Sequence, residues 1–482
     1  MGGFHRPAED GSPLIAEDPF QFTSFELLAV TQDIRNQEKA NEEDEAEHAH
    51  SLLDPHENRQ HHQMEYSGGE EYFDVIVVGA GIMGSSTAYH LAKRGKKTLL
   101  LEQFDFLHYL GSSHGESRTI RATYPEDYYH PIIAESALLW EQVQQKIGYK
   151  VYFKSQHLDM GPSDNKSLQS MIASCLKNSI PHRVLDSRQV SDEFSGRIEI
   201  PENWVGVVSE MGGVIKPTKA VSMFQTLAIK NGAVLRDRTE VKNIVKKVGG
   251  GVKVVTTNGE NFWGKKCVIT AGAWVGKLVK TVSGLELPIQ PLETNVGYWR
   301  IKEGNDNGSV GVDYGFDGDF PTFASYGEPY VYGTPSLEYP GLIKIATHGG
   351  YPCDPDKRPW GPGMPVGALK EWIEKRFVGR VDSNGPVATQ LCMYSMTPDE
   401  DFVIDFLGGE FGKDVVVAGG FSGHGFKMGP AVGRILTDLV LGGEAGVELK
   451  HFKISRFKEN PQGNVKEFEN QVTLKPKLRS RF

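Results

Sequence analysis

The stretch that decides the fold is Phe73-Asp74-Val75-Ile76-Val77-Val78-Gly79-Ala80-Gly81-Ile82-Met83-Gly84. Its first half is a short apolar run rich in β-branched residues, which predicts a parallel strand buried on both faces. Gly79, Gly81 and Gly84 then predict a tight turn that leads directly into a helix. The first glycine permits the turn, the second lets the backbone approach a pyrophosphate, and the third permits close helix–strand packing. We therefore predict a dinucleotide-binding unit that begins near residue 72.

The residues after this helix complete the unit. Gly95 ends the helix, and residues 97–102 form the second predicted strand. Glu102 follows Gly84 by 18 residues, a position from which a carboxylate can accept hydrogen bonds from an adenosine ribose. The helix N-terminus supplies N–H donors and partial positive charge to the phosphates. This fingerprint by itself does not distinguish FAD from NAD.

The rest of the chain predicts more strands and a second domain. Strands are expected at residues 232–235, 252–257 and 266–273, with an Asn-Gly hairpin turn after the second. A late strand at residues 415–418 precedes a helix that starts near Gly425. The stretches 151–210 and 290–390 are richer in aromatic residues and alternating strands, which predicts an antiparallel substrate domain. A chain of 482 residues has room for two or three domains.

The negative charge of the chain is concentrated at its start. Residues 1–70 contain 16 Asp and Glu against 4 Lys and Arg, whereas the whole chain has a net charge of −10. The remaining chain is therefore nearly neutral, and bulk charge does not support nucleic-acid binding. The low apolar content of the acidic stretch predicts a disordered tail.

The cysteines and the hydropathy exclude several classes of protein. The four cysteines are widely spaced and form no Cys-x-x-Cys pair, which predicts free thiols, a reducing compartment and no metal site. No stretch approaches the roughly 20 apolar residues of a membrane span. The N-terminus also lacks the apolar region of a signal peptide. We expect neither a membrane nor a nucleic acid as a partner.

Six later motifs are specific enough to suggest a family. They are residues 111–121 (GSSHGESRTIR), 269–274 (ITAGAW), Tyr332-Gly333, Lys344 with His348, Cys392-Met393-Tyr394, and residues 421–427 (FSGHGFK). In this order, over about residues 72–460, the chain resembles the monomeric sarcosine oxidase family, which includes the peroxisomal sarcosine/L-pipecolate oxidases. The resemblance is to a eukaryotic, plant-like member.

The resemblance implies one covalently bound FAD per chain. Cys392 is similar to the thiol that bonds the flavin 8α-methyl carbon, and its thiolate would need an electropositive neighbourhood. Taken without its neighbours, a lone cysteine is more often a buried apolar residue.

The same resemblance assigns residues to the flavin ring. Lys344 would lie beside flavin N5, where a fixed cation stabilises the charge that develops as oxygen is reduced. Arg118 would lie over the ring and His114 would contact it, although Ser113 stands where related bacterial enzymes commonly carry a second histidine. Glu116 is not expected to act as a base, because hydride transfer from a neutral amine needs no carboxylate.

The implied substrate pocket has a carboxylate end and an amine end. Arg121 and Lys427 would bind the substrate carboxylate, since a planar guanidinium fork and a point charge both suit that group. Tyr332, Tyr394 and His348 would line the amine side, where an aromatic wall tolerates a neutral amine.

The remaining implied contacts hold the cofactor. Besides the three glycines of the turn and Glu102, they are Ser112, Val241, Gly272, Gly423 and Gly425. The helix expected after Gly425 would direct its N-terminus at the pyrimidine edge of the flavin and favour negative charge there.

These expectations define a fold and a division of the chain. The predicted fold class is α/β: a glycine-oxidase-like, FAD-binding Rossmann domain with an inserted antiparallel-sheet (α+β) substrate domain. The predicted segments are an acidic tail at 1–71, the FAD-binding domain at 72–150, 211–290 and 390–450, the substrate domain at 151–210 and 291–389, and a C-terminal segment at 451–482.

The expected function is oxidation of a secondary α-amino acid, either sarcosine or L-pipecolate, with hydride transfer to FAD followed by reoxidation by O2 to give H2O2. One alternative is a flavin amine dehydrogenase that passes electrons to another acceptor. Lys344 and the absence of a membrane segment argue against it. The other is a non-catalytic flavin-binding scaffold whose acidic tail recruits a partner.

Two further expectations concern location and assembly. The final residues Ser480-Arg481-Phe482 resemble a peroxisomal targeting tripeptide but depart from it in the last residue. We therefore expect a peroxisomal protein, or otherwise a cytoplasmic one. The resemblance implies a monomer.

Overall fold

The computed structural model describes residues 71–302, 320–358 and 363–466. The acidic tail and the C-terminal tripeptide lie outside the described residues. Within them, no helix is both long enough and apolar enough to cross a membrane.

The first sheet is built on the predicted glycine-rich unit. Among the described residues it has eight strands: β1 (Tyr72–Val78), β2 (Thr98–Leu101), β7 (Val234–Arg236), β8 (Val241–Lys246), β9 (Val252–Thr256), β10 (Asn261–Ile269), β17 (Val403–Phe406) and β18 (Val415–Gly419). β1 pairs in parallel with β2 and β10, and β10 pairs in parallel with β18. The expected hairpin is present, because β9 and β10 are antiparallel around Asn258 and Gly259.

Both faces of this sheet are covered, as the apolar run in β1 predicts. Val75 and Val77 pack into a core with residues of four helices: α2 (Ile82–Lys93), α3 (His130–Ile147), α6 (Pro217–Lys230) and α9 (Gly429–Leu441). Ile76 and Val78 pack on the other face with α7 (Val275–Ser283) and with side chains from β8 and β9. Strands buried on both faces are typical of parallel sheets.

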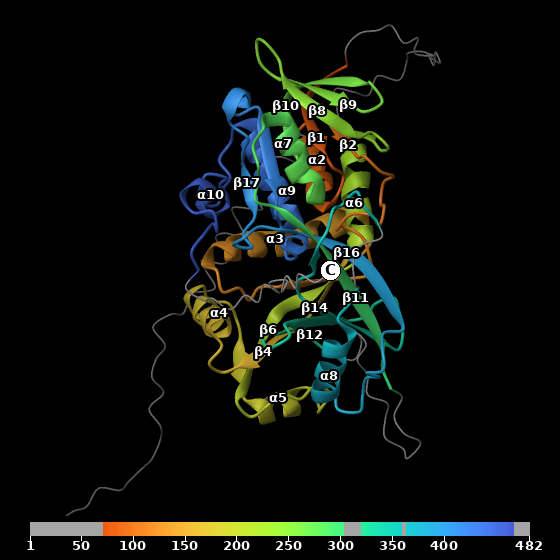
Figure 1. Ribbon diagram of the computed structural model, residues 1–482, viewed down its shortest axis with the longest axis vertical. Helices are drawn as coiled ribbons and strands as arrows, with labels where there is room; N and C mark the ends of the chain where they lie inside the picture. Colours follow the sequence, from red (N-terminus) through yellow and green to blue (C-terminus); the bar gives the residue numbers. More distant parts are fainter. Residues whose placement is uncertain (1–70, 303–319, 359–362, 467–482) are drawn as a thin grey trace, which may run out of the picture. The chain divides into compact units, whose positions relative to one another are not determined.

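The second sheet is mostly antiparallel. Its ten strands in the described chain are β3 (Arg118–Arg121), β4 (Tyr152–Pro162), β5 (Arg183–Leu185), β6 (Trp204–Ile215), β11 (Gln290–Arg300), β12 (Thr322–Ser325), β13 (Val331–Pro335), β14 (Leu342–Thr347), β15 (Tyr351–Pro352) and β16 (Ala388–Met396). β12 and β4 pair in parallel. Three helices connect strands of this sheet: α4 (Lys166–Lys177), α5 (Ser187–Glu193) and α8 (Val366–Arg376). A short helix, α10 (Arg456–Glu459), follows α9 near the end of the described chain. Figure 1 shows the first sheet and its helices above and the second sheet below.

Alternation along the second sheet separates its core from its functional face. In β14, Ile343 and Ile345 pack into a core with Trp372 and Phe377. Lys344 lies between them in sequence, and successive strand residues point to opposite faces. Because Ile343 and Ile345 point into the core, the Lys344 side chain points to the opposite face of the sheet.

The structure departs from the sequence expectations at two places. A 3-10 turn at Phe426–Met428 precedes α9, so the α-helix begins at Gly429 rather than near Gly425, with Pro430 in its first turn. β3 and β16 lie in segments predicted for the FAD-binding domain, yet both are paired in the second sheet. The division into segments stays a prediction.

Candidate active site

The glycine turn is built as a close approach of backbone to backbone. Gly79 has a φ of +97°, and a Cβ there would lie 2.6 Å from the Thr270 carbonyl oxygen. A Cβ on Gly84 would lie 1.8 Å from the Gly79 carbonyl oxygen. Only glycine fits both positions, because the first needs a left-handed backbone and the second leaves no space.

Glu102 is fixed at the end of β2 beside this turn. Its carboxylate accepts hydrogen bonds from the backbone N–H groups of Ala80 (2.8 Å) and Phe104 (3.1 Å). One of its oxygens also lies 3.5 Å from His108 Nε2. The carboxylate is thus held at the edge of the turn, where the sequence predicts a ribose contact.

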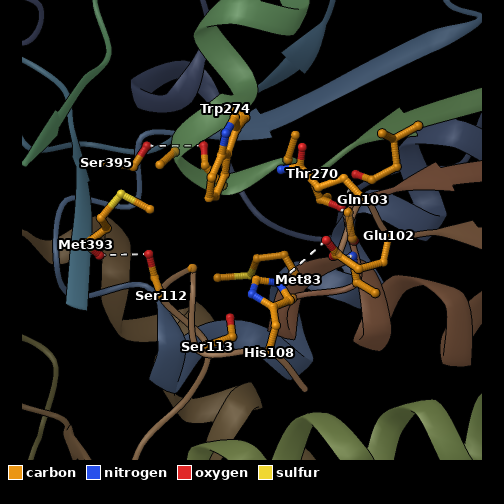
Figure 2. A pocket seen from close by; sticks show the side chains of 18 of the residues that line it. Met83, Glu102, Gln103, His108, Ser112, Ser113, Thr270, Trp274, Met393 and Ser395 are labelled. Carbon is orange, nitrogen blue, oxygen red and sulfur yellow. Dashed lines mark hydrogen bonds and ion pairs between the residues drawn. The ribbon is translucent and has the colours of Figure 1, made fainter. Parts of the chain in front are cut away.

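A cavity of about 500 Å³ opens at the turn. Its lining includes most of the predicted cofactor contacts: Gly79, Gly81, Glu102, Ser112, Val241, Gly272, Gly423 and Gly425. Gly84 does not line it and acts through helix packing instead. Figure 2 shows Glu102, His108 and Thr270 on one side of this cavity and Ser112, Met393 and Ser395 on the other. On that second side, the Ser112 hydroxyl donates to the Met393 carbonyl oxygen at 2.7 Å and so joins the loop before β3 to β16.

A second cavity, of about 140 Å³, adjoins the first. The two share five lining residues: Arg118, Cys392, Tyr394, Gly423 and Phe426. A nucleotide-sized space and a small-molecule-sized space therefore meet at Cys392. We call the smaller one the substrate cavity.

Arg118 and Cys392 meet at this junction from positions 274 residues apart in the sequence. The Arg118 guanidinium lies 3.5 Å from the Cys392 sulfur. It also donates to the carbonyl oxygens of Ser112 (2.9 Å), His114 (2.8 Å) and Ser117 (2.8 Å), which hold it in place. The structure therefore places a held cation against the sulfur that the sequence predicts to bond the flavin.

Lys344 is buried in the substrate cavity. Its ammonium donates to the Ser117 carbonyl oxygen (2.8 Å) and hydroxyl (3.3 Å), and only 3% of the residue is exposed. Burial and, to a smaller extent, Arg118 lower its pKa to about 7. Lys344 therefore holds its charge far less firmly than an ordinary lysine.

The two predicted carboxylate-binding cations converge in the same cavity. Arg121 donates to Asp159 (3.1 Å) and to the hydroxyl of Tyr326 (3.0 Å). Lys427 donates to the hydroxyl of Tyr124 (3.1 Å) and to the His424 carbonyl oxygen (2.9 Å). Burial, followed by the charge of Arg121, lowers the pKa of Lys427 well below its usual range. A bound carboxylate would oppose this decrease, because its negative charge favours the protonated form of Lys427.

The predicted amine side is an aromatic wall. The Tyr394 hydroxyl donates to the Tyr332 hydroxyl at 3.4 Å, and the rings of Tyr394 and His348 lie 5.4 Å apart. Burial lowers the pKa of His348 to about 4, with Arg121 and Lys427 adding to the effect. His348 is therefore neutral at neutral pH.

Two titratable residues of the loop before β3, His114 and Glu116, line neither cavity. His114 is buried but lines neither, and burial, then Arg118, lowers its pKa to about 4. Glu116 accepts hydrogen bonds from the backbone N–H groups of Leu337 (2.6 Å) and Glu338 (3.2 Å). Glu116 thus fixes the distant turn at residues 337–338 through two backbone N–H groups.

Sequence reasoning missed several polar residues in and beside the substrate cavity. The Asp159 carboxylate does not itself line the cavity; it accepts hydrogen bonds from Arg121 and Thr123 and lies 3.2 Å from Nε2 of His157, which does line it. Of this cluster, the sequence predicted only Arg121 in the site. The available signal was the pair His157 and Asp159, two residues apart on one face of a strand. Glu400 also lines the cavity; it stands in the acidic run after Cys392.

The larger cavity fits FAD by its chemistry. The glycine turn can receive a pyrophosphate, Glu102 can receive a ribose, and the far end meets a cysteine beside a fixed cation. These are the residues that would hold the cofactor.

Comparisons with known proteins identify the family of this chain. Residues 74–439 match the family model described as "DAO: FAD dependent oxidoreductase". The chain is 68% identical over 416 residues to a probable sarcosine oxidase of Arabidopsis thaliana, covering 85% of this chain and 99% of the relative. It is 36% identical over 396 residues to a peroxisomal sarcosine oxidase of Homo sapiens, covering 80% and 97%.

A solved structure shows the same fold. The open form of NikD, an unusual amino acid oxidase essential for nikkomycin biosynthesis, superimposes with a TM-score of 0.68 at 23% identity. The superposition covers 80% of this chain and 97% of that one. The predicted fold class is thereby confirmed. The glycine turn, the cavity that fits FAD and these relatives together place the chain in the FAD-dependent oxidoreductase family, within its sarcosine oxidase group.

Proposed function

We propose that this protein is a flavin-dependent oxidase of secondary α-amino acids. Sarcosine would give glycine, formaldehyde and H2O2, and L-pipecolate would give piperideine-6-carboxylate and H2O2. The observation that carries the proposal is the junction of the two cavities, with Cys392 and Arg118 at the contact and Arg121, Lys344 and Lys427 in the smaller one. The similarity to two relatives named as sarcosine oxidases supports the substrate class.

The substrate cavity orients an amino acid by its carboxylate. When bound, FAD supplies the acceptor for a hydride and the route of electrons to oxygen. Arg121 and Lys427 come from β3 and from the turn before α9, and they would hold the carboxylate between them. Because these supports are independent, the carbon next to nitrogen would be held in one position. Tyr332, Tyr394 and the neutral His348 would face the amine.

Lys344, Arg118 and Cys392 would serve the flavin. In its protonated form, Lys344 would stabilise the charge that develops as oxygen is reduced, since a positioned cation in a dry site acts strongly. Arg118 would counter negative charge on the ring and keep Cys392 reactive for a covalent bond to FAD. His114 would act indirectly, through the carbonyl oxygen that accepts from Arg118.

We also propose a monomer located in peroxisomes. The word "peroxisomal" in the name of the human relative supports the location. The tripeptide Ser480-Arg481-Phe482, fused to a fluorescent reporter, tests it: punctate import supports the proposal, and a diffuse signal contradicts it.

The function is tested by peroxide release from the purified flavin-loaded protein in air. The substrates are sarcosine, L-pipecolate, L-proline, D-alanine and glycine. Peroxide from sarcosine or pipecolate but not from D-alanine is the expected result. If no substrate yields peroxide while one still bleaches the flavin anaerobically, the protein is a dehydrogenase and the oxygen role of Lys344 is wrong. If none bleaches the flavin, the proposal fails.

A further inference from the structure

A carboxyl group that the proposed chemistry leaves unused lies in the substrate cavity. Glu400 lines that cavity and is only 6% exposed. One of its carboxyl oxygens lies 3.9 Å from Nε2 of His348, on the wall proposed for the amine. The other is buried and has no hydrogen-bond partner in the part of the chain that the structure describes. A buried, unsatisfied carboxyl oxygen calls for an explanation, because burial without a partner is costly.

The backbone of Glu400 is held in an unfavourable conformation. Its φ is +60°, in the left-handed region that residues other than glycine rarely adopt. Its carbonyl oxygen accepts a hydrogen bond from His424 Nε2 at 3.0 Å. Strain of this kind persists where the surrounding structure over-determines it, and it gathers at functional sites.

A hydrogen-bond chain connects Glu400 to the carboxylate end of the cavity. Because Nε2 of His424 donates to Glu400, its Nδ1 must accept from the Tyr124 hydroxyl, 3.1 Å away. That hydroxyl in turn accepts from the Lys427 ammonium at 3.1 Å. Burial holds the pKa of His424 well below its usual range, which keeps the imidazole neutral and this direction of donation fixed. The position of Glu400 is therefore set relative to the group that would bind the substrate carboxylate.

An amino acid in water presents a difficulty that this geometry can resolve. Its nitrogen is an ammonium, and an alkyl ammonium such as that of lysine has a pKa of about 10.4. Only the neutral amine has the lone pair needed to lose a hydride from the neighbouring carbon. The aromatic wall and the neutral His348 offer no negative charge to receive the excess proton.

We propose that Glu400 accepts the proton of the substrate ammonium, directly or through His348, and so produces the reactive neutral amine within the cavity. One N–H bond breaks, its electron pair stays on nitrogen, and an O–H bond forms on the Glu400 carboxylate. The hydride then leaves carbon as an ordinary part of the proposed oxidation, and Glu400 returns its proton to water before the next turnover. This inference rests on the proposed function.

The charges around Glu400 suit this role. Burial raises its pKa to about 7, the charge of Lys466 opposes the increase, and Glu126, Asp401 and Asp399 add to it. The ring groups that face it are His348, His424 and Tyr330. A carboxyl that titrates near neutral pH can both take up and release a proton at working pH.

The test compares the wild type with Glu400→Gln in the flavin-loaded state. The rate of anaerobic flavin bleaching by sarcosine is measured from pH 6 to 10. Removal of a general base typically lowers a rate by ~10²–10⁴-fold. For the wild type we expect the rate to rise through about pH 7. For the variant we expect a loss of this size at pH 7.5 and recovery only as pH approaches the amine's own pKa. Glu400→Asp should restore part of the rate.

Two controls separate this role from a structural one. Methoxyacetate has an ether oxygen in place of the amine, and its affinity, measured by perturbation of the flavin spectrum, should be equal in the wild type and in Glu400→Gln. Glu116→Gln removes another buried carboxyl, one that lines neither cavity, and its pH profile should match the wild type.

The outcomes also separate this inference from the proposed function. If Glu400→Gln keeps the wild-type rate and pH profile, Glu400 is not the acceptor. Equal weakening of methoxyacetate binding and of the rate would likewise overturn the inference, because it indicates a damaged cavity. If the wild-type flavin is not bleached by any secondary amino acid, it is the proposed function that fails.

Discussion

At the scale of single residues, burial decides what a side chain can do. Lys344 would be an unremarkable strand lysine if it faced solvent. Instead it lies in the lining of the substrate cavity, where its ammonium donates hydrogen bonds to Ser117, 227 residues away in the sequence. Its low pKa follows from burial first and from Arg118 second.

The oxygen role of Lys344 makes the first prediction. Replacing it by methionine keeps a similar volume and removes the cation. We expect reoxidation of the flavin by O2 to slow by roughly 10²–10³-fold, the usual loss when one preorganised electrostatic group is removed. Anaerobic reduction by substrate should change much less. Stopped-flow traces of the two half-reactions measure this, and equal slowing of both would contradict the assignment.

The second prediction concerns the covalent bond between Cys392 and the flavin, and it follows from the contact between Arg118 and Cys392. The wild-type band on a denaturing gel should fluoresce, because the flavin stays bonded to the chain. Cys392→Ser should abolish this fluorescence. Cys267→Ser is the matched control, since Cys267 is a fully buried thiol in the core of the first sheet and does not line either cavity. A colourless wild-type band above a yellow supernatant would refute covalent attachment and leave the fold assignment intact.

At the scale of elements, the approach of α2 to the end of β1 makes the nucleotide site. The first turn of α2 lies so close to the preceding strand that a single methyl group at Gly84 has no space. β14 and β16 deliver Lys344 and Cys392 by strand alternation and by their pairing with β11. Elements, rather than loops, therefore hold most of the site rigid.

Gly84→Ala tests the element-scale argument. We expect a loss of several kcal/mol in the free energy of unfolding, because the overlap is with backbone and cannot relax. The amount of flavin bound per protein should decrease as well. Gly367→Ala is the control: Gly367 is an exposed residue in the first turn of α8, with nothing within 4 Å of the added carbon, and its effect should stay within about 0.5 kcal/mol. Thermal melts and the ratio of flavin to protein absorbance report both quantities, and equal melting of the two variants would count against close packing.

At the scale of the whole molecule, both cavities are lined only by residues that follow the acidic tail, from Val78 onward. The family match also begins after that tail, at residue 74.

Deletion of residues 1–70 follows as the last prediction. The shortened protein should keep its bound flavin and its kcat for sarcosine, because no lining residue is removed. Peroxide release per flavin measures this. A scaffold that works through its acidic tail would instead lose its partner, and loss of turnover on deletion would show that the tail contributes to the site.

Local backbone requirements made part of this protein predictable from its amino-acid sequence. The glycine turn after an apolar strand, the Asn-Gly hairpin and the acidic character of the first 70 residues are properties of neighbouring residues, so a short stretch is enough to predict them. The resemblance in motifs also named Cys392, Lys344, Arg121 and Lys427 as one site. The structure brings these four residues to the lining of a single cavity.

Only the tertiary structure decided how those residues are supported. The pairing of β3 and β16 in the second sheet and the position of His114 outside both cavities depend on contacts between distant segments. So do the cluster around Asp159 and the unsatisfied carboxyl of Glu400. The pKa of a buried group is set by the solvent it loses and by charges brought beside it, and both arise only when the elements pack. The sequence thus names candidate groups, whereas the packing of two sheets determines which of them are charged, neutral or poised near pH 7.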